Sequence, residues 1–206
     1  EFMRIVKARG SISGFESQVY RKNGDVIWIS ENARAVVDDE GNVLHYEGTV
    51  RIVEQEEARR LFPRVYERVR RVTPGMLSRS RDWWELRTLR DVPDNRDGGG
   101  PKRFVVLECA GRPEGYAIYR HKPRWDQGVS DSDLVVVEAV ALDGRPTAEL
   151  WRYLLDIDWA ARVVARLLPV DHALFQLLAT PRRMRFRVGD GLWARLVDVG
   201  KALSAR

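Results

Sequence analysis

Histidine and cysteine, the side chains most often found in metal and nucleophilic sites, are scarce in this chain. The three histidines, His45, His121 and His172, are far apart in the sequence and lack the close spacing of metal ligands. The single cysteine, Cys109, lies in an expected strand with no helix start or cationic neighbour to favour its thiolate. The sequence therefore predicts no metal site and no catalytic residue among these side chains, and it excludes an intrachain disulfide.

The acidic residues give no clearer signal. Asp156 and Asp158 lie at the end of an expected helix, where helix capping or pairing with a nearby arginine accounts for them. A general acid–base pair would need a geometry that spacing alone cannot supply. The glycine-rich stretch 93–101 lacks the GxxxxGK[ST] frame of a phosphate-binding loop, so it is expected to be a surface loop.

The elements that must position any site centre on residues 103–155. Three runs rich in β-branched and aromatic residues are separated by turn signals and followed by a helix that opens at Pro146. The run Leu134 to Val137 is apolar on both faces, as in a central strand covered by helices. Trp151 and Leu154 recur at helical spacing and would cover it. A layered core of sheet and helices is predicted.

Helices and strands are expected on both sides of this core. Leu61, Val65 and Val69 form an i, i+4 stripe that predicts a helix over 54–72, and Pro63 either kinks this helix or moves its start to about Leu61. The remaining expected elements are a helix capped by Ser80 and reaching Leu89, a strand over 161–170, a helix capped by Asp171, a strand over 186–188 and a last strand over 192–197.

The first fifty residues predict three antiparallel strands with tight turns. Asn23-Gly24 is a two-residue hairpin signal, residues 38–42 form a second turn, and a third strand is expected over 43–53. The hairpin RKNGDVIWI, the turn ENARAVVDDEGNV and the ending HYEGTVR resemble the C-terminal half, or PAC part, of a PAS sensor domain. About a dozen residues precede Phe15, so the resemblance implies no ligand cavity of the PAS kind.

A second resemblance covers residues 51–206. The blocks LFPRVYERVRRVTPGMLSRSRDWWE, FVVLECAGRPEGYAIYR, ELWRYLLDID and DGLWARLVDVGKALSAR occur in order. They resemble the middle domain of the Eis (enhanced intracellular survival) family, GNAT-fold aminoglycoside N-acetyltransferases. In that family an N-terminal GNAT domain binds acetyl-CoA and the carboxylate of a third domain completes the catalytic site, so the resemblance implies that neither is in this chain. Trp83 and Trp193 match positions that border the aminoglycoside cleft, with core packing as the alternative.

The loop that would hold acetyl-CoA in a GNAT enzyme departs from the family's pattern. GNAT enzymes hold the CoA pyrophosphate on the backbone amides of a Q/R-x-x-G-x-G/A loop. The corresponding stretch, residues 142–148, has Gly144 as its only glycine, lacks an amide at Pro146 and adds negative charge at Asp143. No cofactor is therefore expected. Acetyl-CoA would be the cofactor only if the chain is an N-acetyltransferase, which is the alternative function.

Composition favours a cytoplasmic protein without membrane spans. The formal net charge is +5, and it is uneven: six basic and eight acidic residues in positions 1–49 give −2, which leaves 29 and 22, or +7, for the remainder. Acidic residues interleave with the basic ones and no nucleic-acid motif accompanies them, which argues against nucleic-acid binding. No run approaches the roughly 18 apolar residues of a membrane span.

The sequence thus predicts an α+β protein in two parts. Residues 1–50 are expected to be a partial, PAS-type β-meander, and residues 51–206 a GNAT-like domain with a mixed, mainly antiparallel sheet and flanking helices. The strand over 43–53 fits both patterns, which favours a chimera, natural or engineered, with a non-catalytic, structural or interaction role. The alternative is a GNAT N-acetyltransferase that acts on aminoglycosides or other amines. A third interpretation is self-association through open sheet edges.

Overall fold

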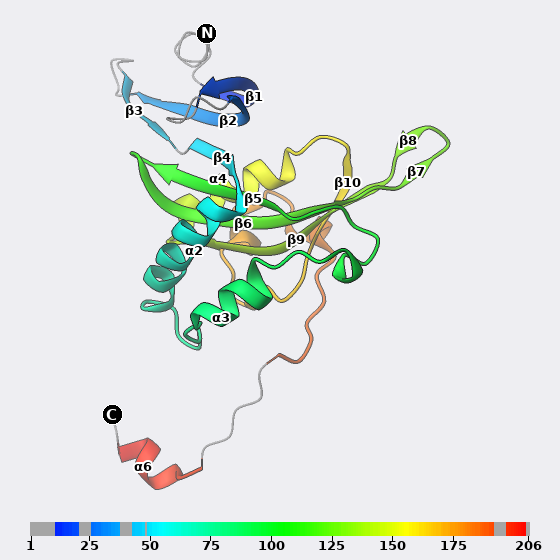
Figure 1. Cartoon of the computed structure of the whole chain (residues 1–206). Helices are drawn as coiled ribbons and strands as arrows, with labels where there is room; N and C mark the ends of the chain where they lie inside the picture. Colours follow the sequence, from blue (N-terminus) through cyan, green and yellow to red (C-terminus); the bar gives the residue numbers. More distant parts are fainter. Residues whose placement is uncertain (1–10, 21–25, 38–42, 48, 192–196, 205–206) are drawn as a thin grey trace. The chain divides into compact units, whose positions relative to one another are not determined.

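The structure, a computed structural model, describes residues 11–20, 26–37, 43–47, 49–191 and 197–204 (Figure 1). The chain divides into two compact units, residues 1–166 and 167–206.

A three-stranded antiparallel sheet comes first, in the order β1-β2-β3. β1 spans Ser11–Tyr20, β2 spans Val26–Val37 and β3 spans Val43–Glu47. Three antiparallel strands were expected in this part of the chain, and they are present. Their expected turns at 21–25 and 38–42 lie outside the described residues.

The third strand is shorter than expected. β3 pairs with β2, whereas β4 (Thr49–Val53) pairs with β5 (Arg103–Cys109) in a second sheet. Residues 43–47 thus pair in the first sheet and residues 49–53 in the second, and residue 48 between them lies outside the described residues. Strand alternation in a sequence shows where side chains point, but it does not show which neighbour receives the hydrogen bonds.

The second sheet has five strands in the order β10-β9-β6-β5-β4 (Figure 1). Its remaining members are β6 (Arg112–Lys122), β9 (Ser132–Ala141) and β10 (Ala160–Ala165). All neighbours are antiparallel except β9 and β10, which are parallel. This arrangement confirms the predicted GNAT-like mixed sheet.

The turn between β5 and β6 is a two-residue loop. Cys109 pairs with Arg112, which leaves Ala110 and Gly111 as a two-residue loop with φ angles of 49° and 72°. Positive φ at both positions is typical of a type I′ hairpin, whose twist matches that of the flanking strands.

Helix α4 (Gly144–Leu155) provides the crossover that the parallel strands β9 and β10 require. It begins two residues before the expected Pro146. Leu150, Trp151 and Leu154 are buried against one face of the sheet, and the Tyr153 hydroxyl lies 3.1 Å from that of Tyr119 on β6.

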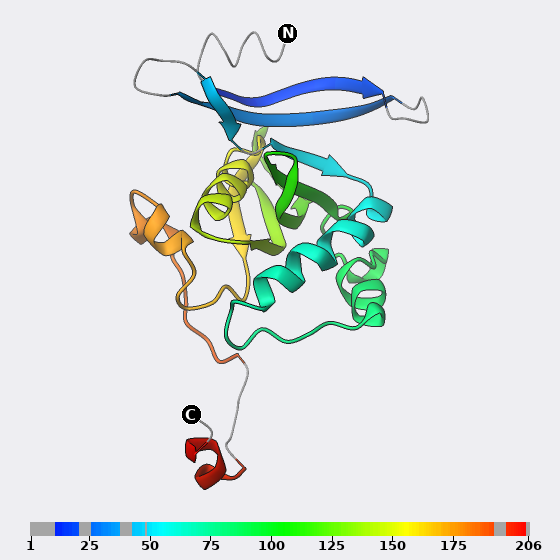
Figure 2. The same ribbon diagram turned by 90° about the vertical axis from the view of Figure 1, so that its left-hand side faces the viewer.

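Helix α2 (Gln55–Arg70) covers the opposite face of the sheet (Figure 2). It runs without interruption through Pro63, so the alternative start at Leu61 is wrong. Its buried face includes Phe62, whose ring stacks on that of Tyr116 with centroids 4.3 Å apart. The residues buried around this stack form the main hydrophobic core: Val53, Ala58, Leu61, Phe62, Val65, Tyr66, Trp84, Leu89, Phe104, Val106, Tyr116 and Ile118.

The expected helix after Ser80 begins in the normal α-helical form and then widens. The Ser80 hydroxyl accepts the N–H of Trp83 at 3.1 Å, which caps α3 (Arg81–Trp83). The π-helical turn η1 (Trp84–Thr88) follows directly and buries Trp84 in the core. Such turns are rare and often lie beside functional sites.

The last expected elements are only partly right. β10 ends at Ala165 and not at residue 170, and α5 (Leu174–Leu177) has Ala173 at its N-cap where Asp171 was expected. The N–H of Leu174 instead donates a hydrogen bond to Nδ1 of His172, at 3.1 Å. Short polar residues before a helix predict a cap without fixing which residue starts the turn.

The expected strand over 186–188 is absent from the described residues, and that over 192–197 lies almost entirely outside them. The shorter elements are β7 (Trp125–Asp126), β8 (Val129–Ser130), η2 (Pro93–Asn95), η3 (Pro181–Met184) and α6 (Val199–Ser204). Within the described part of the chain, no helix is both long and apolar enough to cross a membrane.

Candidate functional site

The site that the fold suggests lies where β9 loses its parallel neighbour. Pairing with β10 ends at Val136 and Ala165, while β9 continues to Ala141. At the same point the register with β6 shifts, because Ile118 pairs with Glu138 and Tyr119 with Val136. We call this point the fork. Beyond it, one edge of β9 has no neighbouring strand among the described residues.

Val137 is the extra residue of a β-bulge at the fork. A bulge leaves its extra residue out of the ladder, so its backbone groups are available to other partners. The Val137 side chain is 43% exposed, although it belongs to a central strand of the sheet. The fork therefore combines an open strand edge with backbone amide groups that a ligand can reach.

A half-buried ion pair holds β9 just past the bulge. The Arg79 guanidinium donates two hydrogen bonds to the Glu138 carboxylate, at 2.9 and 2.6 Å, and the Tyr116 hydroxyl donates to the same group. Arg79 also lies over the ring of Tyr66, 4.0 Å from its centroid. Burial and the neighbouring Glu138 raise the pKa of Tyr116 well above its ordinary value. With three hydrogen bonds, Glu138 is better suited to fixing the strand than to accepting a substrate proton.

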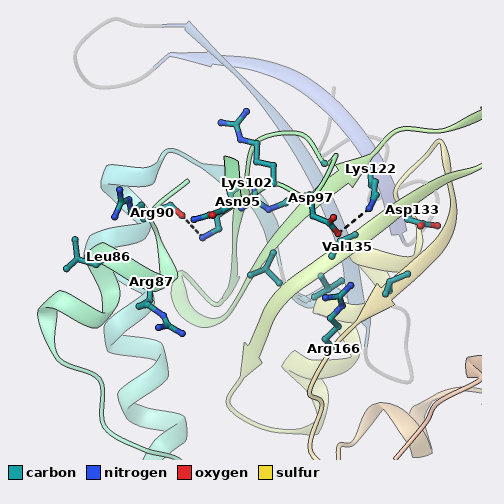
Figure 3. A pocket seen from close by; sticks show the side chains of 16 residues that line it. Leu86, Arg87, Arg90, Asn95, Asp97, Lys102, Lys122, Asp133, Val135 and Arg166 are labelled. Atoms are coloured by element: carbon teal, nitrogen blue, oxygen red, sulfur yellow. Dashed lines mark hydrogen bonds and ion pairs between the residues drawn. The ribbon is translucent and has the colours of Figure 1, made fainter. Parts of the chain in front are cut away.

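A pocket of about 480 Å³ opens beside the fork, on the face of the sheet that α2 and η1 cover (Figure 3). Its apolar floor comes from β9 and β10 and includes Val135, Val137 and Val164. Its rim is strongly basic, and we call it the basic pocket. The cationic residues that line it are Arg87, Arg90, Arg96, Lys102, Arg120, Lys122 and Arg166.

Asp91 organises one wall of the basic pocket. Its carboxylate accepts hydrogen bonds from Arg120 at 2.6 Å, from Arg96 at 3.1 Å and from the backbone N–H of Lys102 at 3.0 Å. Burial acts to raise the pKa of Asp91, but the hydrogen bonds from Arg120 and from the Lys102 N–H, together with the charges of Arg120 and Arg96, outweigh it, and the pKa is lowered. The loop that follows η1 is thereby fixed against β6.

The N-terminus of α4 fits a bound pyrophosphate poorly. The Asp143 carboxylate accepts the N–H of Arg145 at 3.0 Å, and the N–H of Thr147 donates to the Asp143 carbonyl oxygen at 3.1 Å. Pro146 has no N–H, and a side chain at Gly144 would meet nothing within 4 Å, so the loop forms no close backbone cradle. The helix start is already capped by a carboxylate of its own.

Of the two tryptophans expected at a substrate cleft, only Trp83 lies within the described residues. Trp83 is 47% exposed and does not line the basic pocket; the Arg87 guanidinium lies 5.2 Å from its ring centroid. Trp83 is not buried in the core either, which was its alternative role. Trp193 lies outside the described residues.

The expectation of no histidine or cysteine site stays a prediction. No group of three or more metal-ligating side chains occurs among the residues that the structure describes. Burial lowers the pKa of His121 and His172. Cys109 is half-buried, and burial together with Glu114 raises its pKa to about 11, which disfavours the reactive thiolate.

Little in the sequence indicates which residues converge on the basic pocket. Arg87, Arg90 and Arg166 are three of many arginines in this chain, and nothing in their sequence positions sets them apart. Only the folded sheet brings residues from η1, the loop over 90–102 and the end of β10 to one pocket. The sequence does not reveal the bulge at Val137. The run Leu134 to Val137 is apolar throughout, so it has no alternation that a bulge could interrupt.

Comparison with known proteins relates the chain to acetyltransferases. The model of the acetyltransferase (GNAT) domain family matches residues 75–196. An uncharacterized N-acetyltransferase of Streptomyces avermitilis is 41% identical over 142 residues, which covers 69% of this chain and 34% of the relative. N-acetyltransferase Eis of Mycobacterium tuberculosis is 34% identical over 165 residues, covering 77% and 37%. The chain thus spans about a third of the length of these relatives.

Solved structures are similar at a lower level. A putative acetyltransferase from Agrobacterium tumefaciens has a TM-score of 0.45 and 12% identity, covering 70% of this chain and 99% of its own. A likeness of this size adds nothing to the sequence matches.

These matches overturn the expected non-catalytic role. The relatives are named N-acetyltransferases, so the alternative interpretation of the sequence is the better supported one. The family match also weakens the expectation that no cofactor is involved. Neither the family match nor these relatives support a PAS half or a chimera.

Proposed function

The chain belongs to the GNAT acetyltransferase family, and from that premise we propose that the protein is an N-acetyltransferase that moves the acetyl group of acetyl-CoA to an amine. The observation that carries the proposal is the fork, where β9 bulges at Val137 and leaves β10. Acetyl-CoA, when bound, supplies a thioester whose acetyl group the amine nitrogen receives as the C–N bond forms and the C–S bond breaks.

The open edge of β9 suits the pantetheine arm of this cofactor. The arm carries two amide groups, and an unpaired strand edge offers amide N–H and C=O groups to an extended chain as it would to another strand. The bulge at Val137 adds a backbone N–H released from the ladder. A donor of this kind stabilises an oxygen that gains negative charge during acyl transfer.

The pyrophosphate is the part of the cofactor that this chain does not fit. The amides at the start of α4 are occupied by Asp143 or missing at Pro146, so no phosphate contact is assigned to them. We further propose that the chain is one domain of a longer, Eis-type protein, and that another part of that protein binds the pyrophosphate. The identity to Eis over 165 residues and the coverage of about a third of its length support this.

The first experiment is a titration of acetyl-CoA into the purified chain, followed by calorimetry and by tryptophan fluorescence. An assay of free CoA thiol with a panel of amines then measures transfer. We expect saturable binding and thiol release that depends on the amine. No binding up to millimolar acetyl-CoA and no thiol release with any amine would overturn the proposal.

The bulge is tested by Val137→Pro, which removes its backbone N–H, against Val137→Ala, which keeps it. Proline is tolerated at bulges, so we expect Val137→Pro to fold, and circular dichroism checks this. Loss of one oxyanion donor lowers kcat by about 100-fold or more, whereas Val137→Ala leaves kcat within about threefold of wild type. Equal rates for the two variants would exclude the role assigned to this amide.

A further inference from the structure

The basic pocket carries more positive charge than the acidic residues that line it can neutralise. Seven of its lining residues are arginine or lysine, and only Asp97 and Asp133 are acidic. Asp133 pairs with Arg162, which lies outside the lining, at 2.7 Å. Little of the positive charge is therefore neutralised from within the pocket.

Three of the cations have carboxylate partners. Arg96 and Arg120 share Asp91, and Lys122 lies 3.3 Å from Asp97. Two guanidinium groups on one carboxylate leave a net positive charge at that wall, in a position where Arg120 is buried. A buried cation with incomplete neutralisation attracts anions more strongly than a solvated one.

Three other cations have no carboxylate partner. Among the described residues, Arg87, Arg90 and Arg166 form no ion pair, and all three are exposed. Arg87 comes from η1 and Arg166 follows β10, and Figure 3 shows them on opposite sides of the pocket. Arg87 also lies 5.2 Å from the ring centroid of Trp83, so the charges of these residues flank the pocket from both sides without a carboxylate among the described residues to neutralise them.

Lys102 lies in the same positively charged surroundings. Its Nζ donates to the carbonyl oxygens of Thr88 and Arg90, each at 2.7 Å, and meets no carboxylate directly. Burial and the charge of Arg120 lower its pKa, and the more distant Asp91 opposes this only in part. The helix end to which it is bound thus carries a fixed cation beside the pocket.

The remaining surface of the pocket suits a small molecule. Its volume of about 480 Å³ is within the range of small-ligand sites, and Val135, Val137 and Val164 provide an apolar floor. Val137 is also the bulge residue of the fork. A ligand whose anionic end lies among the arginines therefore extends its other end toward the fork.

We propose that the basic pocket binds the anionic end of the acceptor, so that the substrate is an amine bearing a phosphate or carboxylate and not a polycationic amine. This inference rests on the proposed N-acetyltransferase function for its choice of amine. Paired arginines bind both oxyanions through two parallel hydrogen bonds, and a phosphate carries the larger charge. A polycation placed in the same pocket is repelled by the unpaired guanidinium groups.

Three probes of matched length test the binding step by calorimetry, without CoA. They are O-phosphoethanolamine, β-alanine and ethanolamine, which present a phosphate, a carboxylate and no anion. We expect phosphate or carboxylate to bind at least about tenfold more tightly than ethanolamine, with affinity falling as NaCl is raised. The order of the first two identifies the anion preferred.

Charge reversals locate the site. Arg90→Glu and Arg166→Glu remove unpaired cations of the pocket, and Arg64→Glu makes the same change on the exposed side of α2, outside the pocket. We expect each pocket variant to weaken binding of the anionic probe by about tenfold, and Arg64→Glu by less than about twofold. Equal effects of all three would mean that only net charge matters, which overturns the proposal.

The two proposals fail in different ways. Binding of the anionic probe that depends on Arg90 and Arg166, without any acetyl transfer, supports the pocket and contradicts the N-acetyltransferase. Transfer to ethanolamine or to a polycationic amine at rates no lower than to the anionic amines, unchanged in Arg166→Glu, supports the enzyme and overturns the anionic acceptor.

Discussion

At the scale of single residues, Glu138 and Arg79 best illustrate how the site is held in place. Glu138 stands immediately after the bulge, and its partner comes from the segment just before α3. The side chains of Arg79 and Glu138 are only 17% and 20% exposed. An ion pair so little hydrated depends on both partners, because removing one leaves the other charge without compensation.

We expect Glu138→Gln to lower the free energy of unfolding by about 2 kcal/mol, since it leaves the Arg79 guanidinium half-buried without a carboxylate. Glu67→Gln is the control, because Glu67 pairs with Arg70 on the solvated side of α2 and such pairs contribute less than about 1 kcal/mol. Urea unfolding of both variants measures the difference. Similar losses in the two would mean that Glu138 is no more than an ordinary surface partner.

At the scale of elements, the loop between η1 and β5 depends on one carboxylate. Asp91 connects that loop to β6 through Arg120 and to its own far end through the N–H of Lys102. The sequence predicted only a surface loop here. Its fixed conformation follows from the ion pairs and not from its glycine-rich composition.

The lowered pKa of Asp91 predicts how stability depends on pH. The folded pKa lies below the unfolded value of about 3.9, so the stabilisation by Asp91 is complete above that value and is lost as pH falls through the folded pKa. Asp91→Asn is expected to be less stable than wild type at pH 7 and to lose less stability between pH 5 and pH 2. Asp94→Asn, an exposed change in the same loop, provides the control.

Urea midpoints at pH 7, 5, 4, 3 and 2 for the three proteins make this comparison. A parallel decline of Asp91→Asn and wild type would show that other groups cause the acid sensitivity.

At the scale of the whole molecule, the boundary expected at residue 50 stays a prediction, as do a cytoplasmic location and self-association through sheet edges. Among the described residues, β1, β2 and β3 pair only with one another, and β4 begins the larger sheet. A three-stranded sheet is marginally stable unless its apolar face is covered.

If residues 1–50 are a domain of their own, the amides of 11–47 exchange with solvent faster than those of β9. We expect the difference in protection to be at least tenfold, because opening of a small sheet costs less free energy than opening of the five-stranded one. Hydrogen exchange followed by mass spectrometry measures both regions in one sample. Equal protection would indicate a single cooperative unit.

The sequence by itself determined the secondary elements of the five-stranded sheet, its helices and the layered α+β class. These depend on local periodicity: β5, β6 and β9 alternate or run apolar, and α2 repeats every three to four residues. It also indicated the family, through blocks of residues in a fixed order. The poor fit of Asp143 and Pro146 to a phosphate could be predicted too, since it follows from residue type.

Only the tertiary structure decided where those elements meet. The end of β10 pairing at Val136, the bulge at Val137 and the convergence of Arg87 with Arg166 depend on strand order and register. Hydrogen-bond partners across a sheet are chosen by contacts between residues far apart in the chain, which local periodicity does not record. The same holds for charge: the sequence gives a net value, but the fold determines which arginines keep a carboxylate partner and which face a pocket without one.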